Sequence, residues 1–277
     1  MRAMRTDDLP AAAAVSADAF GIDIHEPPLA ARWQQRVAHP LSTDPQGAFV
    51  AEQDGSLIGV AQALARERLW CLSLLAVSPQ GQSSGAGRAL LESALAYRAA
   101  TEAGLITSSD DPRALRLYAL AGFSLRPTFE AAGTIDRSAL PRPAAQVSEG
   151  GVADLDELAS ISREIRGAPH TLELEFALRG GAQLMRFGDR GYVVVRPGHA
   201  VWLLVARDEA AAAALLWSAL AVVGETERPM VRWITGAQQW AIEIVLRAGL
   251  QLASYGALCV RGRPGPLRPF LPSPPFA

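Results

Sequence analysis

The N-terminal half of the chain alternates between the spacing of amphipathic helices and that of buried strands. Thr6-Asp7-Asp8 supplies cap residues for a helix over residues 6–20, and a second helix is predicted over residues 29–37. Asp54-Gly55 separates two apolar runs and is the turn signal of a β-hairpin. The pattern then predicts a strand over residues 69–77, a helix over 87–103, a strand over 104–108, a helix over 112–121 and a closing strand after Gly122.

The same order of elements starts again after a proline-rich stretch at residues 140–146. VADLDELASI echoes TDDLPAAAAV, and YVVVRPGHAVWLLVA again reads as strand, turn and strand. Pairing Gly122 with Gly249 places Ala241 opposite Ala114. The sequence therefore predicts two copies of one unit. They are a domain over residues 1–138, a linker over 139–146 and a second domain over 147–277 that ends in a Pro-rich tail.

Composition narrows the class of protein. The 277 residues are 49% hydrophobic and 19% charged, which is typical of a compact globular protein. The net charge of −2 argues against nucleic acid or a membrane surface as partner, and the longest apolar stretch, residues 210–223, is too short to span a bilayer. Cys71 and Cys259 lie far apart in apolar runs, so we expect no disulfide, no metal site and a cytoplasmic location.

A glycine-rich turn lies between the predicted strand at 69–77 and the helix that follows it. Its sequence, Gln82-Ser-Ser-Gly-Ala-Gly-Arg88, leaves the first N–H groups of the helix unobstructed, which is the arrangement that binds a pyrophosphate. All 26 basic residues are Arg, so a lysine-dependent phosphate loop is excluded, and Leu90 stands where a dinucleotide fingerprint needs glycine. A plain turn from strand to helix remains the alternative.

A second motif follows the turn. Asp111-Pro-Arg-Ala-Leu-Arg-Leu-Tyr118-Ala-Leu-Ala-Gly122-Phe123 resembles the N-x-x-A-x-x-L-Y-x-x-x-G-F helix of the GNAT N-acetyltransferase superfamily, with Asp111 in place of Asn. The strand LSLLAV and the glycine turn resemble the acyl-CoA loop of the same superfamily. The resemblance covers residues 1–138 and implies an α/β (α+β) fold. It extends to tandem proteins of two GNAT-like domains, each a mixed, mainly antiparallel sheet flanked by helices.

The resemblance also implies which residues form the site. Tyr118 would act as general acid toward the departing thiolate, because a phenol with a pKa near 10 can hydrogen-bond to, or protonate, a thiolate of pKa about 8.5. Strand backbone would pair with the pantetheine arm, and loop amides would hold the pyrophosphate of acetyl-CoA. The expected cofactor-binding residues are Leu75, Ala76, Val77, Gln82, Ser83, Ser84, Gly85, Ala86, Gly87, Arg88 and Asp111.

The general base stays unassigned. The strand at 69–77 carries no carboxylate, and Cys71 and Ser73 are its only polar or reactive side chains. Glu52 and Glu67 are the nearest acids, and a base acting through ordered water or an amine that arrives neutral would serve as well. His25 lies where the resemblance places an acceptor-binding loop, although a lone loop histidine is more often a surface residue.

The second copy lacks both signatures. Asp208 and Glu209 stand at the start of the helix that matches the one after the glycine turn, and they would repel a pyrophosphate. Val245 stands opposite Tyr118. We therefore expect a degenerate second domain that binds no acyl-CoA. We expect the tail to pack rather than stay in water, because it contains Leu267, Phe270 and further apolar residues.

The expected activity is transfer of an acyl group, in the first instance acetyl, from acetyl-CoA to a primary amine. A non-catalytic acyl-CoA-binding or regulatory module is the first alternative, and an interaction scaffold that binds no cofactor is the second. The acceptor, a small-molecule or peptide amine, is not identified by the sequence. A monomer and a homodimer remain equally open.

Overall fold

The computed structural model describes residues 1–97, 101–142, 144–196, 199–225 and 227–276. These residues divide by packing into two compact units, one over 1–106 and the other over 107–276. Pro143 of the expected linker and part of the expected helix over 87–103 lie outside the described residues.

The first unit is a mixed sheet with helices on both faces. Its strands follow the order β1-β2-β3-β4-β5, antiparallel except for the parallel pair β4 and β5. The strands are β1 (Arg2–Ala3), β2 (Ala48–Gln53), β3 (Ser56–Arg66), β4 (Leu69–Val77) and β5 (Ala103–Ser108), the last two residues of which belong to the second unit. The helices are α1 (Leu9–Ala19), α2 (Pro27–Thr43) and α3 (Ala86–Ala96), with short 3-10 turns at Thr6–Asp8, Pro45–Gly47 and Pro79–Gly81.

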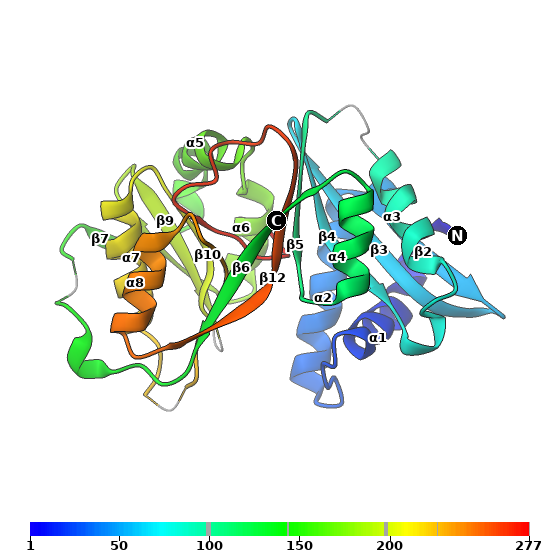
Figure 1. Cartoon of the computed structure of the whole chain (residues 1–277), viewed down its shortest axis with the longest axis horizontal. Coiled ribbons are helices and arrows are strands. Elements are labelled where there is room, and N and C mark those ends of the chain that lie inside the picture. The colour runs from blue at the N-terminus through cyan, green and yellow to red at the C-terminus, as the bar shows by residue number, and fades with distance from the viewer. Residues whose placement is uncertain (98–100, 143, 197–198, 226, 277) are drawn as a thin grey trace. The chain divides into compact units, whose positions relative to one another are not determined.

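Alternation along the strands builds two cores in this unit. Val60, Leu74 and Ala76 face α1 and α2 in one buried cluster. The opposite face receives α3, where the Trp70 indole donates to the Ala94 carbonyl at 3.0 Å (Figure 1). The predicted hairpin turn is confirmed, because Asp54 and Gly55 both have positive φ, as a two-residue turn between strands requires.

The second unit repeats the order of elements of the first copy. Two helices, three strands, a helix, a strand, a helix and a strand succeed one another, which confirms the predicted tandem architecture. Its helices are α4 (Pro112–Leu120), α5 (Leu155–Arg166), α6 (Thr171–Arg179), α7 (Glu209–Ala221) and α8 (Gln239–Arg247), with 3-10 turns at Arg137–Ala139 and Val152–Asp154. Its strands are β6 (Ser124–Ala132), β7 (Val147–Gly150), β8 (Gln183–Phe187), β9 (Gly191–Arg196), β10 (His199–Ala206), β11 (Met230–Thr235), β12 (Gln251–Gly262) and β13 (Phe270–Leu271).

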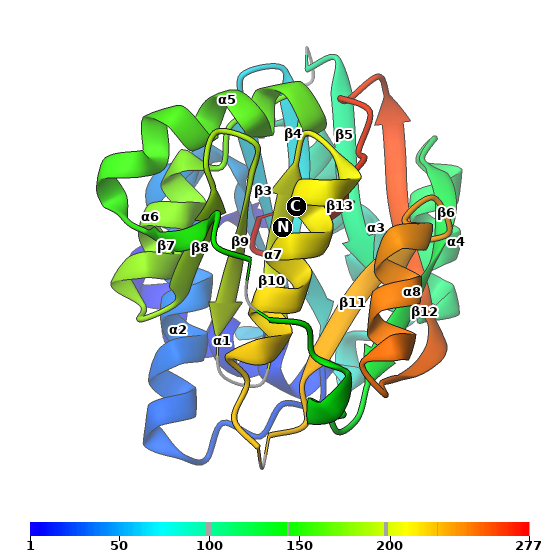
Figure 2. The ribbon, with the colours of Figure 1, turned by 90° about the vertical axis from the view of Figure 1, so that its left-hand side faces the viewer.

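One sheet of the second unit has the order β13-β10-β9-β8-β7, with every neighbouring pair antiparallel. Helix α7 lies across one face of this sheet (Figure 2). Helix α5 packs on the other face, where its Ser162 hydroxyl lies 2.7 Å from the Tyr192 hydroxyl of β9. The main core forms on the α7 side, around residues such as Leu215, Leu216 and Val193.

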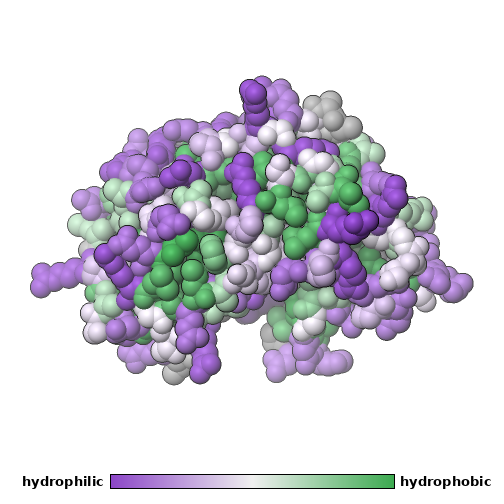
Figure 3. Space-filling model, in the orientation of Figure 1, coloured by the Kyte–Doolittle hydropathy of each residue, from purple (hydrophilic) through white to green (hydrophobic). Residues whose placement is uncertain are grey.

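Strand β6 lies between β11 and β12 and pairs antiparallel with both. The boundary between the two packed units lies at residues 106 and 107, whereas the boundary between the two sequence repeats lies after residue 138. Helix α4 and strand β6 of the first repeat therefore belong to the second unit. Helix α4 packs against β6 and β12 in the same unit. Apolar side chains gather on the surface beside α8, toward β6 and β12 (Figure 3).

The C-terminal tail is packed, as predicted. Leu267, Phe270, Leu271 and Phe276 are each no more than 3% exposed, and β13 adds a strand to the free edge of β10. The Arg166 side chain, 1% exposed, donates to the carbonyl of Phe276. Of the helices in the described part of the chain, none is long and apolar enough to cross a membrane.

Two predicted helix lengths differ from the structure. The helix expected over 29–37 is α2, which continues to Thr43 and contains Pro40 in its interior. The helix expected over 87–103 is α3, which ends at Ala96, and Tyr97 is already extended with φ −66° and ψ 120°. Tyr97 donates from its hydroxyl to Asp44 at 3.0 Å, so a tertiary hydrogen bond holds the chain where the helix stops.

Candidate functional site

Strand β4 parts from β5 halfway along its length. The parallel register runs from Leu69 opposite Ala103 to Leu72 opposite Ile106, and no pair of β4 with β5 follows within the described residues. The pairing with β3 shifts at the same place, so that Ser73 is an extra residue, a β-bulge. The C-terminal half of β4 therefore has one edge that β5 does not cover.

The register with β3 decides which backbone groups face that edge. The Ser78 amide donates to the Ile58 carbonyl at 2.8 Å, which marks a hydrogen-bonded pair. Such pairs alternate along an antiparallel ladder, so Ala76 directs its N–H and C=O toward β3. Leu75 and Val77 direct theirs to the opposite edge. Of the three expected strand residues, Leu75 and Val77 thus carry the backbone groups suited to an added strand-like ligand.

Arg36 on α2 holds the bulge in place. Its guanidinium donates to the Ser73 carbonyl at 2.6 Å and to the Ser73 hydroxyl at 2.8 Å. Ser73 is 3% exposed, so both acceptors are buried and would be costly to leave unpaired. Sequence analysis did not single out Arg36, because a charged residue on an amphipathic helix ordinarily faces solvent.

The glycine turn is locally ordered by its own side chains. The Ser78 hydroxyl accepts from the Gly81 amide, and the Ser84 hydroxyl donates to the Gly81 carbonyl at 2.6 Å. Ser83 and Gly85 have φ of +64° and +88°. Left-handed residues in such a loop turn successive N–H groups toward a common concavity, and Gly85 adopts this φ without the strain that Ser83 carries.

The N-terminus of α3 is open. Gly85 is its cap residue and has no side chain to accept a hydrogen bond from the first turn. Ala86 and Gly87 are partly exposed, and the segment from Gly81 to Arg88 contains no carboxylate. Arg88 is exposed and pairs with Glu92 at 2.8 Å one turn along the helix. The Ala86 amide donates to the Ser84 hydroxyl at 3.3 Å, and the other first-turn amides and the helix dipole favour an anion here.

The Gln82 side chain lies at the junction of strand and turn. Its carboxamide nitrogen is 3.5 Å from the Val77 carbonyl, and the residue is half-buried. This contact ties the turn to the end of β4. The expected residues from Leu75 to Arg88 thus form one continuous surface within the first unit, made of an open strand edge, a bend and a helix N-terminus.

Asp111 and Tyr118 belong to the second unit. Asp111 caps α4 by accepting from the Arg113 amide at 2.9 Å. The Arg113 guanidinium also pairs with both carboxylate oxygens and lowers the pKa of Asp111. The carboxylate is therefore occupied by helix capping, a role that asparagine also fulfils.

Tyr118 is 5% exposed on α4. Among the residues that the structure describes, its hydroxyl has no hydrogen-bond partner. Burial raises the pKa of Tyr118, and the nearby Cys259 and Asp111 add to the shift. The phenol therefore keeps its proton throughout the neutral and moderately alkaline range, as a general acid requires.

The side chains considered as general base or acceptor-binding groups are paired with other residues, exposed or buried. Glu52 accepts from Arg2, whose guanidinium lowers the pKa of this carboxyl. Glu67 lies in an exposed turn with φ +51°. Cys71 is buried, so the structure gives it no access to a substrate. The His25 side chain is 98% exposed, as is usual for a lone histidine in a loop.

The corresponding places in the second copy are filled by the chain itself. Asp208 caps α7 by accepting from the Ala211 amide, and Arg190 pairs with the same carboxylate at 2.6 Å. The tail strand β13 lies along β10, with Leu271 opposite Leu204. Val245 is fully buried on α8. In the residues that the structure describes, no cluster of three or more potential metal ligands is present.

Comparison with known proteins matches part of the chain to a known family. Residues 12–123 match the acetyltransferase (GNAT) family model. Over 86 residues the chain is 35% identical to the mycothiol acetyltransferase of Streptomyces griseus subsp. griseus, a match that covers 29% of this chain and 28% of that protein. The chain thus matches little more than a quarter of that relative.

Solved structures agree over nearly the whole chain. A protein from Pyrococcus horikoshii described as an acetyltransferase superposes with a TM-score of 0.81 at 16% identity, covering 98% of this chain and 92% of that one. A tandem GNAT protein from the clavulanic acid biosynthesis pathway has a TM-score of 0.59 at 14% identity, covering 95% and 97%. Residues 12–123 therefore match the GNAT family, and the fold of the whole chain is similar to that of a tandem GNAT protein.

Proposed function

We propose that this protein is an N-acyltransferase that moves an acetyl group from acetyl-CoA to a small-molecule or peptide amine. The match of residues 12–123 to the GNAT family model supports acyl transfer in general. The observation that carries the proposal is the continuous surface from the open edge of β4 to the uncapped N-terminus of α3. Two buried free cysteines agree with the predicted cytoplasmic location.

The residues of the first unit fit the cofactor. The N–H and C=O groups of Leu75 and Val77 would bind the amides of the pantetheine arm as a neighbouring strand does. The amides from Ser83 to Arg88 would bind the pyrophosphate, to which the turn presents no carboxylate. Within the second copy, Asp208 caps the equivalent helix and β13 lies along the equivalent strand. We therefore propose one acetyl-CoA site per chain.

The residues of the chain would then stabilise charge and hold a proton. When bound, acetyl-CoA supplies a thioester carbonyl that a neutral amine attacks. Amides on the open edge of β4 would stabilise the negative charge on the carbonyl oxygen. Burial raises the pKa of Tyr118, so its Oη stays protonated and would donate a hydrogen bond or the proton to the departing sulfur.

Titration calorimetry with acetyl-CoA tests the binding step through Gly87. A Cβ at this position would lie 3.6 Å from Val77, an ordinary contact, so Gly87→Ala is the matched control and should bind normally. Gly87→Glu adds a carboxylate at the helix N-terminus. A unit charge about 5 Å from a phosphate costs roughly 1–3 kcal/mol at intermediate dielectric, so affinity should fall about tenfold to a hundredfold. Equal binding by the Glu and Ala variants would refute the assignment.

A non-catalytic acyl-CoA-binding module is the second candidate function. It is favoured by the absence of a carboxylate on β4 and by the pairing of Asp111 with Arg113. Turnover against a panel of primary amines, followed by release of free thiol, separates the two functions. Binding without turnover of any amine would favour the module, whereas amine-dependent thiol release would establish the transferase.

A further inference from the structure

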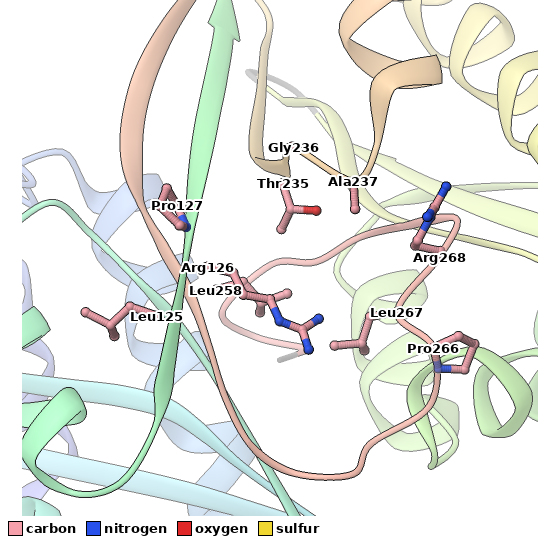
Figure 4. A pocket seen from close by; sticks show the side chains of 10 residues that line it. All are labelled: Leu125, Arg126, Pro127, Thr235, Gly236, Ala237, Leu258, Pro266, Leu267 and Arg268. Carbon is pink, nitrogen blue, oxygen red and sulfur yellow. The ribbon is translucent and has the colours of Figure 1, made fainter.

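A pocket of about 340 Å³ opens within the second unit. Its size lies in the range of small-molecule sites. Strand β6, the turn from β11 to α8, strand β12 and the tail each contribute walls (Figure 4). The lining residues are Leu125, Arg126, Pro127, Thr235, Gly236, Ala237, Leu258, Pro266, Leu267 and Arg268.

Two apolar side chains of the lining are held by buried contacts. Leu258 and Leu267 are 2% and 3% exposed. Gln238 fixes the tail wall, since its carboxamide donates to the Leu267 carbonyl at 2.8 Å and accepts from the Trp240 indole at 2.9 Å. Gln238 stands at the N-cap position of α8, but its side chain accepts no hydrogen bond from the first turn of that helix. The pocket is therefore preformed by buried contacts and borders an open helix N-terminus.

Arg126 supplies an uncompensated positive charge. Its side chain reaches from β6 toward Leu267 across the pocket (Figure 4). Among the described residues it has neither an ion-pair partner nor a hydrogen-bond acceptor, and none of the ten lining residues is acidic. Arg268, at the other end of the pocket, is 3.5 Å from Glu209. Arg126 is thus the guanidinium that is available to a ligand.

Thr235 offers a second polar group beside the apolar walls. The residue is 7% exposed, and its side chain projects into the pocket from the end of β11. Its carbonyl accepts from the Gln238 amide, but its hydroxyl has no hydrogen-bond partner among the described residues. The Thr235 hydroxyl is accessible from the pocket, so it can donate a hydrogen bond to a ligand there.

We propose that this pocket binds a small molecule with an apolar body and a carboxylate or phosphate group. Arg126 would pair with the anionic group, in the two-pronged geometry that guanidinium groups form with such oxygens. Thr235 would donate to the same group. Leu125, Leu258 and Leu267 would cover the apolar body. All ten lining residues belong to the second unit, and the proposal does not depend on the proposed transferase activity.

Methyl NMR of leucine-labelled full-length protein tests the proposal with 4-phenylbutyrate, phenyl phosphate and the neutral 4-phenylbutyramide. The two anions should produce saturable shifts at the methyls of Leu125, Leu258 and Leu267, and the amide should bind at least about tenfold more weakly. Tighter binding of phenyl phosphate would assign the pocket to phosphates, and tighter binding of 4-phenylbutyrate to carboxylates.

Three variants locate the binding. Arg126→Gln should weaken the anions about tenfold or more and leave the amide unchanged, and Thr235→Val should weaken them by a smaller factor. Arg142→Gln, an exposed arginine outside the lining, should match the natural protein. Acetyl-CoA binding should be the same in all three. The proposal is overturned if no probe gives saturable shifts at millimolar concentration, if the amide binds as tightly as the anions, or if Arg126→Gln changes nothing.

Discussion

The role assigned to Tyr118 makes a sharp prediction. Tyr118→Phe removes one oxygen atom that has no hydrogen-bond partner among the described residues, so no buried donor or acceptor is left unsatisfied. We expect the free energy of unfolding to change by less than about 1 kcal/mol. Loss of a general acid typically lowers turnover about 10²- to 10⁴-fold, which corresponds to roughly 3–5 kcal/mol of transition-state stabilisation.

Tyr192→Phe is the matched control. Tyr192 is another buried tyrosine, but its hydroxyl lies 2.7 Å from the Ser162 hydroxyl and 2.9 Å from His170 Nδ1. Its removal should destabilise the protein by roughly 1–2 kcal/mol and leave turnover unchanged. Tyr118→Phe should therefore lower turnover with little change in stability, whereas Tyr192→Phe should lower stability with no change in turnover.

Thiol release with the best amine of the panel measures turnover, and calorimetry with acetyl-CoA measures binding. Tyr118→Phe should lower kcat and leave acetyl-CoA affinity within about twofold, because the phenol would act on the leaving group. Since burial raises the pKa of Tyr118, its titration should not lower natural kcat below about pH 10. If Tyr118→Phe keeps half or more of the natural kcat, the assignment as general acid is refuted.

Three further predictions concern stability and are read from melting curves. Asp44→Ala should cost about 3–5 kcal/mol, because it removes the buried carboxylate that lies 2.7 Å from the Arg66 guanidinium; an unchanged Tm would contradict this. Phe270→Ala should cost about 3–5 kcal/mol by opening a cavity under the tail, whereas Phe20→Ala, at an exposed position, should cost far less. Burial and the charges of Arg36 and Arg66 lower the pKa of His39 to about 4. The stability that depends on neutral His39 should therefore be complete above pH 6.5 and should be lost as the pH falls toward 4, because the unfolded chain takes up a proton there more readily than the folded one. His39→Gln should reduce this loss.

Local signals in the sequence predicted most of the elements that carry the site. The Asp54-Gly55 turn and the glycine-rich turn before α3 depend on φ values that a few residue types accept, so short motifs identify them. The helix expected over 112–121 is α4, Pro112–Leu120, and its start follows from Asp111 as cap and Pro112 after it. Burial of the tail followed from its apolar residues alone.

Features that depend on distant parts of the chain were not predictable in this way. Helix α2 continues through Pro40, which local preference would place at a helix end. The buried pairing of Asp44 with Arg66 joins residues from a helix end and a strand, and nothing in their neighbourhoods indicates it. The bulge at Ser73 and its contact with Arg36 arise from packing of α2 on β4. The open edge of β4 was therefore expected only because the sequence resembles the acyl-CoA loop of the GNAT superfamily.

The position of β6 between β11 and β12 has a consequence for synthesis of the protein. When Ala132 leaves the ribosome, about 100 residues must still be made before the first of these partner strands is complete. At 5–20 residues per second, β6 would wait roughly 5–20 s with both edges unpaired. Unpaired strand edges bind to other chains, so this interval is the time when a nascent chain needs a chaperone most. A gene cut at the linker would make that wait permanent, because β6 would then be produced without either partner.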